Sequence, residues 1–325
     1  VAQGDTGTAG GLSVGIGIAT NTLRNDTKSH IDSSLVSAQS IRVQAQSPAL
    51  TGDGQYRVDA LALGGAVSAS SGTALTGALA GAGAGATNTI NNTTEASIRD
   101  NDTTDTAAYR VNATAGDVTV NAADHSSIRA DAGGFSIGLA RSGSGSAGSL
   151  SVGASVANNT IGSDTSLVTA YIHGYTVDAT GAIDIDASST ATINALAMGG
   201  SGAGSQGVTA SGALAGAGAG TTNLIQMDID AHVSQSSTIT SGAAFTIDAT
   251  DVSQIVADAG GVAIALAQGD TGTTGGLSVG IGVATNTLQN DTKAYINDSD
   301  VTGQSVQVQA QSPALTGDGQ YRVDA

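Results

Sequence analysis

Apolar and polar residues alternate with a period of two in several parts of the chain. Valine, isoleucine or leucine occupies every second position in residues 262–266 and 277–283, and apolar and polar residues alternate in residues 306–310. Successive side chains of a β-strand point to opposite faces, so this pattern predicts strands. Clusters of Gly, Asp and Thr such as residues 269–272 predict turns between them. No ten-residue stretch has a helical period, and we expect an all-β protein.

The strands belong to a repeat. Residues 1–60 recur almost unchanged at 266–325, an offset of 265 residues. Within this period an Ile/Val-x-Ala marker closes each of four shorter units, and two adjacent glycines follow it. These glycines are Gly64, Gly65, Gly133, Gly134, Gly199, Gly200, Gly260 and Gly261. The predicted units are 61–130, 131–195, 196–257 and 258–325, with 1–60 as the tail of a preceding long repeat.

Such tandem units predict one continuous repeat array, in which each unit contacts only its neighbours. We expect a β-solenoid or a stacked-sheet filament. With strands about 4.8 Å apart, two or three rungs per unit would give roughly 10–15 Å of fibre for each unit.

Bulky and small residues alternate from unit to unit. After the glycine pair, Phe135, Ile137 and Leu139 match small residues at positions 66, 68 and 70 of one neighbour and 201, 203 and 205 of the other. A second strand repeats this, since residues 152, 154 and 156 match glycines at 81, 83 and 85. We expect the bulky face of one unit to fit the glycine face of the next, which gives a dense Gly/Ala/Val core without aromatic residues.

The composition limits the kind of core that the chain can form and the partners that it can bind. The 325 residues include 47 glycines and no tryptophan, so any core is thin. The formal net charge of −17 does not favour nucleic acid or anionic membranes as partners. No run of large apolar residues is long enough to span a membrane. The absence of cysteine is compatible with export. Because the chain starts at Val1, we expect the natural protein to extend beyond both ends.

One asparagine follows the glycine-rich strand in every unit. A structural interpretation is a ladder of amides or a turn cap at the same place in each rung, and a functional one is a polar ligand-binding row. We favour the structural interpretation. The asparagines are Asn21, Asn88, Asn159, Asn223 and Asn286.

No residue pattern predicts a catalytic site. His30 in one copy of the long repeat is Tyr295 in the other, and a catalytic or metal-binding histidine could not change in this way. We expect these to be exposed strand residues. Calcium could bind oxygen ligands at an acidic turn, for which the candidates are Asp100, Asp102 and Asp105. Solvated turns are the favoured reading of these aspartates and of Asp53, Asp298, Asp300 and Asp318, and we expect no cofactor.

Two other functions stay open. A β-helical enzyme such as a polysaccharide lyase would need clustered acid, base or cation ligands in one rung. A flat face for ice or a polysaccharide would need a Thr-x-Thr row in register. The strand at residues 118–120 and its counterparts in the other units carry no such row at their outward positions. These positions are Thr119, Asp184, Thr246 and Gln307.

The sequence resembles repeats of very large bacterial surface proteins. The motifs that carry the resemblance are residues 283–288, 292–296 and 306–310, and related motifs recur in each unit. The pattern is similar to leukotoxin-type filamentous adhesins and giant haemagglutinin-like repeat proteins. This resemblance implies a secreted β-rich filament at the cell surface that works in attachment or cell–cell connection. It supplies no catalytic residues, and further copies of the repeat are the expected partners.

Overall fold

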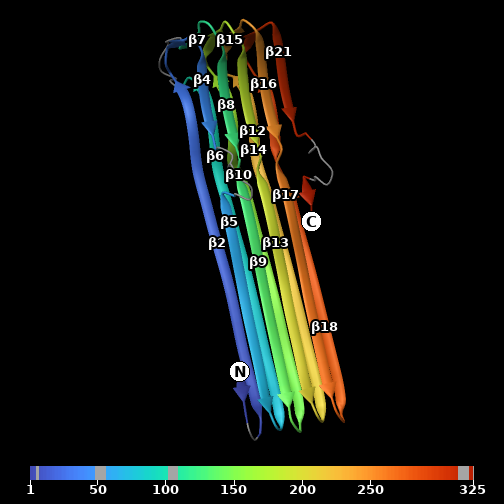
Figure 1. The fold of residues 1–325 in the computed structure, drawn as a ribbon. Helices are drawn as coiled ribbons and strands as arrows, with labels where there is room; N and C mark the ends of the chain where they lie inside the picture. The colour runs from blue at the N-terminus through green and yellow to red at the C-terminus, as the bar shows by residue number, and fades with distance from the viewer. Residues whose placement is uncertain (5–6, 48–55, 102–108, 314–321, 325) are drawn as a thin grey trace.

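The computed structural model describes residues 1–4, 7–47, 56–101, 109–313 and 322–324. Every helix or strand found in these ranges is a β-strand, and all the pairings are parallel. Each strand pairs with the corresponding strand of the coils before and after it, so the chain winds as a β-solenoid (Figure 1). The prediction of an all-β repeat architecture is confirmed.

Two sheets of long strands form most of the molecule, and most strands of the first are longer than those of the second. The first long sheet contains β2 (Ala9–Asp32), β6 (Leu75–Arg99), β10 (Ser146–His173), β14 (Ala210–Ser234) and β18 (Thr273–Leu288), with β19 (Asp291–Ile296) also paired to β14. The second long sheet contains β1 (Ala2–Gln3), β5 (Val58–Gly72), β9 (Ser127–Ser142), β13 (Thr192–Gly207), β17 (Gln254–Gly269) and β22 (Val323–Asp324).

Two short sheets lie at one end of the molecule, the upper end in Figure 1. One contains β3 (Val36–Ala38), β7 (Arg110–Ala113), β11 (Thr176–Ala179), β15 (Thr238–Ser241) and β20 (Asp300–Thr302). The other contains β4 (Ile41–Gln46), β8 (Val118–Asp124), β12 (Ile183–Ser189), β16 (Ala244–Asp251) and β21 (Ser305–Gln311).

Each predicted unit length corresponds to one coil of the solenoid. A coil runs up a long strand, through two short strands, and back down a second long strand. Coils 1 to 4 are β2–β5, β6–β9, β10–β13 and β14–β17, and coil 5 starts at β18. The expectation of two or three rungs per unit is therefore wrong. One unit adds about 4.8 Å along the solenoid axis instead of 10–15 Å.

The solenoid has a narrow half and a wide half with different cores. In the wide half the short sheets face the second part of the first long sheet, and fully buried isoleucines such as Ile90, Ile98 and Ile185 fill the space. In the narrow half the two long sheets face each other directly, and alanine, glycine and serine fill the interior. The predicted small-residue core describes only the narrow half.

Glycine lets the two long sheets approach closely in the narrow half. A Cβ placed on Gly64 would lie 1.8 Å from the carbonyl oxygen of Gly83, and one on Gly134 would lie 2.0 Å from that of Ala154. No side chain fits in that distance. A Cβ on the adjacent Gly65 would meet nothing within 4 Å, because Gly65 points outward.

The strand register therefore divides the predicted glycine pairs. One glycine of each pair faces the opposite sheet and lies in a single column across four coils. The other glycine of each pair points to the outer face, where the side chains of Leu63 and Phe135 cover Gly133. The inward glycines are Gly64, Gly134, Gly199 and Gly261, and the outward ones are Gly65, Gly133, Gly200 and Gly260.

The expected packing of bulky residues is wrong. Phe135 and Ile281 are 50% and 59% exposed, because the bulky rows of both long strands point out of the solenoid. On the second long sheet the alignment also shifts by one residue. Phe135 pairs with Gly65 and Gly200, not with positions 66 and 201. In the column of Phe135 bulky residues still alternate with small ones from coil to coil, and the Phe135 ring covers Gly200 from outside.

Candidate functional site

A ladder of asparagine amides runs through the solenoid where the narrow half meets the wide half. Each Nδ2 donates a hydrogen bond to the Oδ1 of the next coil, at N–O distances of 2.8–2.9 Å. The last rung, Asn286, donates to the backbone oxygen of Asp324. The three central asparagines are almost fully buried. The ladder is Asn21, Asn88, Asn159, Asn223 and Asn286.

This ladder satisfies polar atoms and holds the register. A shift of one residue between two coils would turn the amides to the outer face, and a shift of two would place Asn159 opposite Ala86 or Ile90. Either shift would leave buried donors unpaired. Because the amides are used by each other and shielded from solvent, this row does not offer a ligand-binding surface.

Buried carboxylates lie close to the ladder, at the break between the short and long return strands. Asp124 accepts hydrogen bonds from Asn92 Nδ2 at 3.3 Å and from the backbone N–H of Ser126 at 3.0 Å. Two coils later, Asp251 forms an ion pair with Arg322 at 2.5 Å and accepts from Ser253. These pairings neutralise or satisfy buried charge, as stability requires.

Aromatic and imidazole rings stack along the outer surface of the wide half. The Tyr171 and His232 centroids are 5.1 Å apart with planes 3° apart, and His232 and Tyr295 are 4.8 Å apart at 2°. In the same column, coils 1 and 2 carry His30 and Ser97. His30 is exposed as expected, whereas His232 is half-buried. The rings cover each other's faces, so this column does not present the open aromatic face on which a sugar ring stacks.

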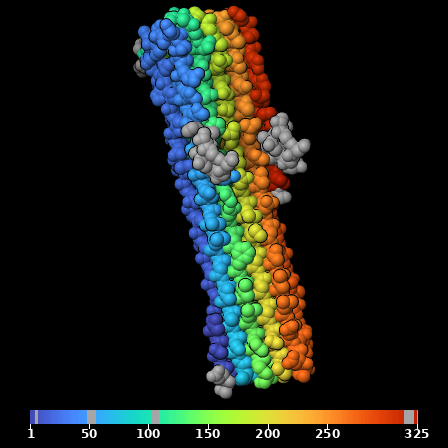
Figure 2. All heavy atoms as spheres, in the orientation of Figure 1, coloured from blue at the N-terminus to red at the C-terminus, as the bar shows by residue number. Residues whose placement is uncertain are grey.

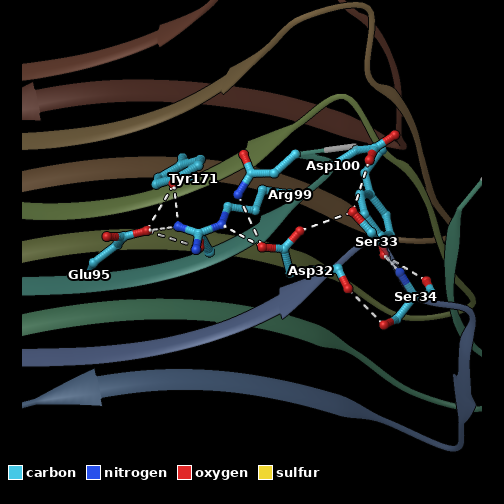
Figure 3. Close-up of polar contacts among 10 residues, drawn as sticks. Asp32, Ser33, Ser34, Glu95, Arg99, Asp100 and Tyr171 are labelled. Atoms are coloured by element: carbon cyan, nitrogen blue, oxygen red, sulfur yellow. Dashed lines mark hydrogen bonds and ion pairs between the residues drawn. The ribbon is translucent and has the colours of Figure 1, made fainter. Parts of the chain in front are cut away.

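A charged cluster joins the first three coils beside this ring stack. Figure 3 shows the guanidinium of Arg99 between Glu95, Asp32 and Tyr171. Arg99 Nε donates to Asp32 at 3.2 Å, and Arg99 Nη1 lies 3.2 Å from the Tyr171 hydroxyl and pairs with Glu95. The Tyr171 hydroxyl donates to Glu95 at 2.9 Å.

The charge states of this cluster are those needed for hydrogen bonds that hold the first three coils together. Burial acts to raise the pKa of Asp32, but hydrogen bonds from Ser33, Arg99 and Asn101 outweigh it and hold that pKa below its ordinary value. Burial raises the pKa of Tyr171 above its usual value. Asp32 therefore stays ionised and the Tyr171 phenol stays neutral near pH 7, which is the state that the observed hydrogen bonds need.

The acidic-turn candidates for calcium are only partly described. Asp100 shares the hydroxyl of Ser33 with Asp32, at 3.0 Å from each carboxylate. Asp102 and Asp105 lie outside the described residues, as do Asp53 and Asp318. Among the residues that the structure places, no group of three or more His, Cys, Asp or Glu side chains is arranged to hold a metal ion.

The remaining histidines each contact a neighbouring coil. The Nδ1 atom of His125 lies 2.5 Å from the hydroxyl of Thr190, and that of His173 lies 3.1 Å from the hydroxyl of Ser234. Burial lowers the pKa of both imidazoles below the ordinary value, so both are neutral near pH 7.

Two further columns of residues, which the sequence did not lead us to expect, flank the asparagine ladder on the outer face. The column on β8, β12, β16 and β21 has the predicted register and is not a threonine row, since it contains Thr119, Asp184, Thr246 and Gln307. The residues before and after each ladder asparagine point outward and form two columns rich in threonine. One column is Thr20, Thr87, Asn158, Thr222 and Thr285, and the other is Thr22, Thr89, Thr160, Leu224 and Thr287.

Comparison of this chain with protein-family models, with curated proteins and with solved structures found no match. In the described ranges, no helix is long and apolar enough to cross a membrane.

Proposed function

We propose that this chain is a segment of the shaft of a secreted surface fibre, and that the fibre mediates attachment or cell–cell connection. The observation that supports the shaft most strongly is that the repeat returns to its starting sequence at coil 5. The first strand of coil 5, β18, repeats the sequence of β2. β2 pairs in register with β6 over its full length, from Ala9↔Thr76 to Asp32↔Arg99. A further coil can therefore pair on β18 in the same way.

The arrangement of the coils and of the buried polar groups supports an architectural role. Figure 2 shows the five coils as continuous parallel bands along the molecule. The buried polar groups described above, the amide ladder, Asp124 and Asp251, bond to other parts of the fold. Their arrangement accounts for stability and register, and no step of catalysis follows from it.

The length of the particle tests the shaft. Chains with one, two and three consecutive long repeats are purified and imaged by electron microscopy. Four coils at about 4.8 Å predict growth of about 19 Å along the axis for each 265-residue repeat. Particles whose axial length does not grow with repeat number would refute the proposal.

The surface location has a separate test. Antibodies against this segment should label intact cells of the source organism. Labelling that appears only after lysis would contradict the secreted location while leaving the shaft itself standing.

A second candidate function rests on the paired threonine columns. Eight of their ten positions are threonine, and the first column is solvent-exposed in every coil. Hydroxyls repeated about every 4.8 Å form a flat lattice that fits a regular ligand such as ice. Measurable inhibition of ice growth, lost in Thr87→Lys and retained in Thr119→Lys, would support this function. Equal ice growth with and without the wild-type chain would exclude it.

A further inference from the structure

The outer face of the first long sheet carries an apolar band in its narrow half. The band contains residues 10–18 of β2 and the positions paired with them in the other four coils, which are 77–85, 148–156, 212–220 and 275–283. None of these residues is charged. Leu12 and Ile16 are 75% and 71% exposed, and the bulky residues of coils 3 and 5 point outward in the same way. An exposed apolar face of this size marks an interaction surface.

Two columns of the band are uniform in all five coils. One is glycine at positions 10, 77, 148, 212 and 275, and the next is leucine at 12, 79, 150, 214 and 277. A groove of about 550 Å³ follows the two columns over coils 1 to 4. A Cβ on any of these glycines would meet nothing within 4 Å, so the packing of this chain does not require glycine there.

Two of the other three columns, those that begin at Val14 and Ile18, alternate bulky and small residues from coil to coil, whereas the column of Ile16 carries small residues in coils 2 to 4. The column that begins at Val14 continues as Gly81, Val152, Gly216 and Val279. Bulky ridges therefore recur every second coil, about 9.6 Å apart when strands are about 4.8 Å apart. Glycine grooves of the same width lie between them. A second copy of this face, shifted by one coil, would place its ridges over the grooves of the first.

The area is sufficient for a stable contact. Nine residues at about 3.3 Å give a band about 30 Å wide, and five coils at about 4.8 Å give about 24 Å along the axis. Two such faces bury about 1,400 Å² in total, within the 1,200–2,000 Å² typical of specific protein interfaces. In a longer array this area grows with every coil.

We propose that the apolar band is a lateral docking surface for a second copy of this chain, so that solenoids pair side by side through their first long sheets. The matched relief favours a copy of the chain over lipid, because a fluid apolar phase needs no glycine grooves. The inference goes beyond the shaft function and does not depend on it, since it concerns contacts across the axis and not along it.

The test introduces charge into the band without altering the interior. Gly83 and Gly218 face outward with open space around their Cα atoms, so the double variant Gly83→Asp/Gly218→Asp leaves the fold intact. Gly81→Lys/Gly216→Lys is a second variant with charge of the opposite sign. The matched control, Gly65→Asp/Gly260→Asp, adds the same charge at open positions on the second long sheet. Circular dichroism checks the fold of each protein.

Sedimentation velocity then measures mass against concentration. We expect the wild type and the control to sediment at twice the monomer mass, and both band variants to remain monomers at the same micromolar concentration. A monomeric wild type would overturn the proposal. Association that persists in the folded band variants would overturn it in favour of end-to-end stacking. A monomeric wild type that binds phosphatidylcholine vesicles would assign the band to lipid instead.

Discussion

Replacing Gly64 by alanine should separate the two long sheets where they are closest. The added Cβ would lie 1.8 Å from the carbonyl oxygen of Gly83, well inside the distance at which carbon and oxygen touch. Backbone atoms form both sides of this contact, so no flexible side chain can move away. Overpacking a core ordinarily lowers the free energy of unfolding by about 1–3 kcal/mol. A clash between two sheet backbones belongs at the upper end of this range, at about 3 kcal/mol.

The neighbouring glycine provides the control. Gly65 lies on the same strand but points outward into open space. Gly65→Ala should be neutral or should stabilise by about 0.4–1 kcal/mol, because alanine restricts the unfolded chain.

Urea unfolding followed by circular dichroism measures both changes as shifts of the midpoint. A Gly64→Ala variant that unfolds at the wild-type midpoint would refute the close approach of the sheets. Equal losses in both variants would refute the division into inward and outward glycines.

Three further changes test buried polar groups, each by urea unfolding midpoint. Asn159→Ala interrupts the amide ladder and should cost about 2–3 kcal/mol, because it leaves a buried donor and acceptor unpaired. The exposed Asn158→Ala should change stability by less than about 0.5 kcal/mol. Ser155 Oγ is buried and finds no hydrogen-bond partner among the described residues, so Ser155→Ala should be neutral or stabilising, whereas Ser151→Ala breaks a 2.6 Å hydrogen bond and should destabilise. Burial and a nearby carboxylate raise the pKa of Asp186, so its contribution is favourable below about pH 3.8 and is lost as pH rises through the folded-state pKa. The midpoint advantage of Asp186→Asn over wild type should therefore grow from acid to neutral pH, and an advantage independent of pH would contradict this.

The strands and their repetition could be predicted because they are local properties of the sequence. Alternation in residues 277–283 and the turn at 269–272 are visible without knowledge of the fold. The structure places the alternating residues in β18 and ends β17 at the predicted turn. The 265-residue offset likewise becomes one cycle of four coils.

The direction of the strand faces could not be predicted in the narrow half. Both faces of β18 are poor in polar groups, so period-two alternation separates bulky from small residues without showing which set is buried. The usual preference for burying large residues gave the wrong answer. Close approach of two backbones buries the small set, as the 1.8 Å between a Cβ placed on Gly64 and the carbonyl oxygen of Gly83 shows.

Part of the candidate site could be predicted because it repeats in the sequence. Asn159 and its counterparts stand out because one residue type recurs at one place in every unit. Stacking of Tyr171, His232 and Tyr295 was missed because their slot was read as variable, although three successive units carry a planar ring there. The Arg99 cluster joins residues from different coils, and its pairing depends on a register that only the fold supplies.

The winding of one whole unit into a single coil sets how much chain a fibre consumes. About 66 residues advance the axis by about 4.8 Å, whereas the same number in an α-helix would extend about 100 Å. A fibre of about 1,000 Å would need about 14,000 residues at this rise per coil. Such a structure favours breadth over reach, and any long fibre made in this way must be either a giant polypeptide or many shorter chains joined at their exposed strand edges.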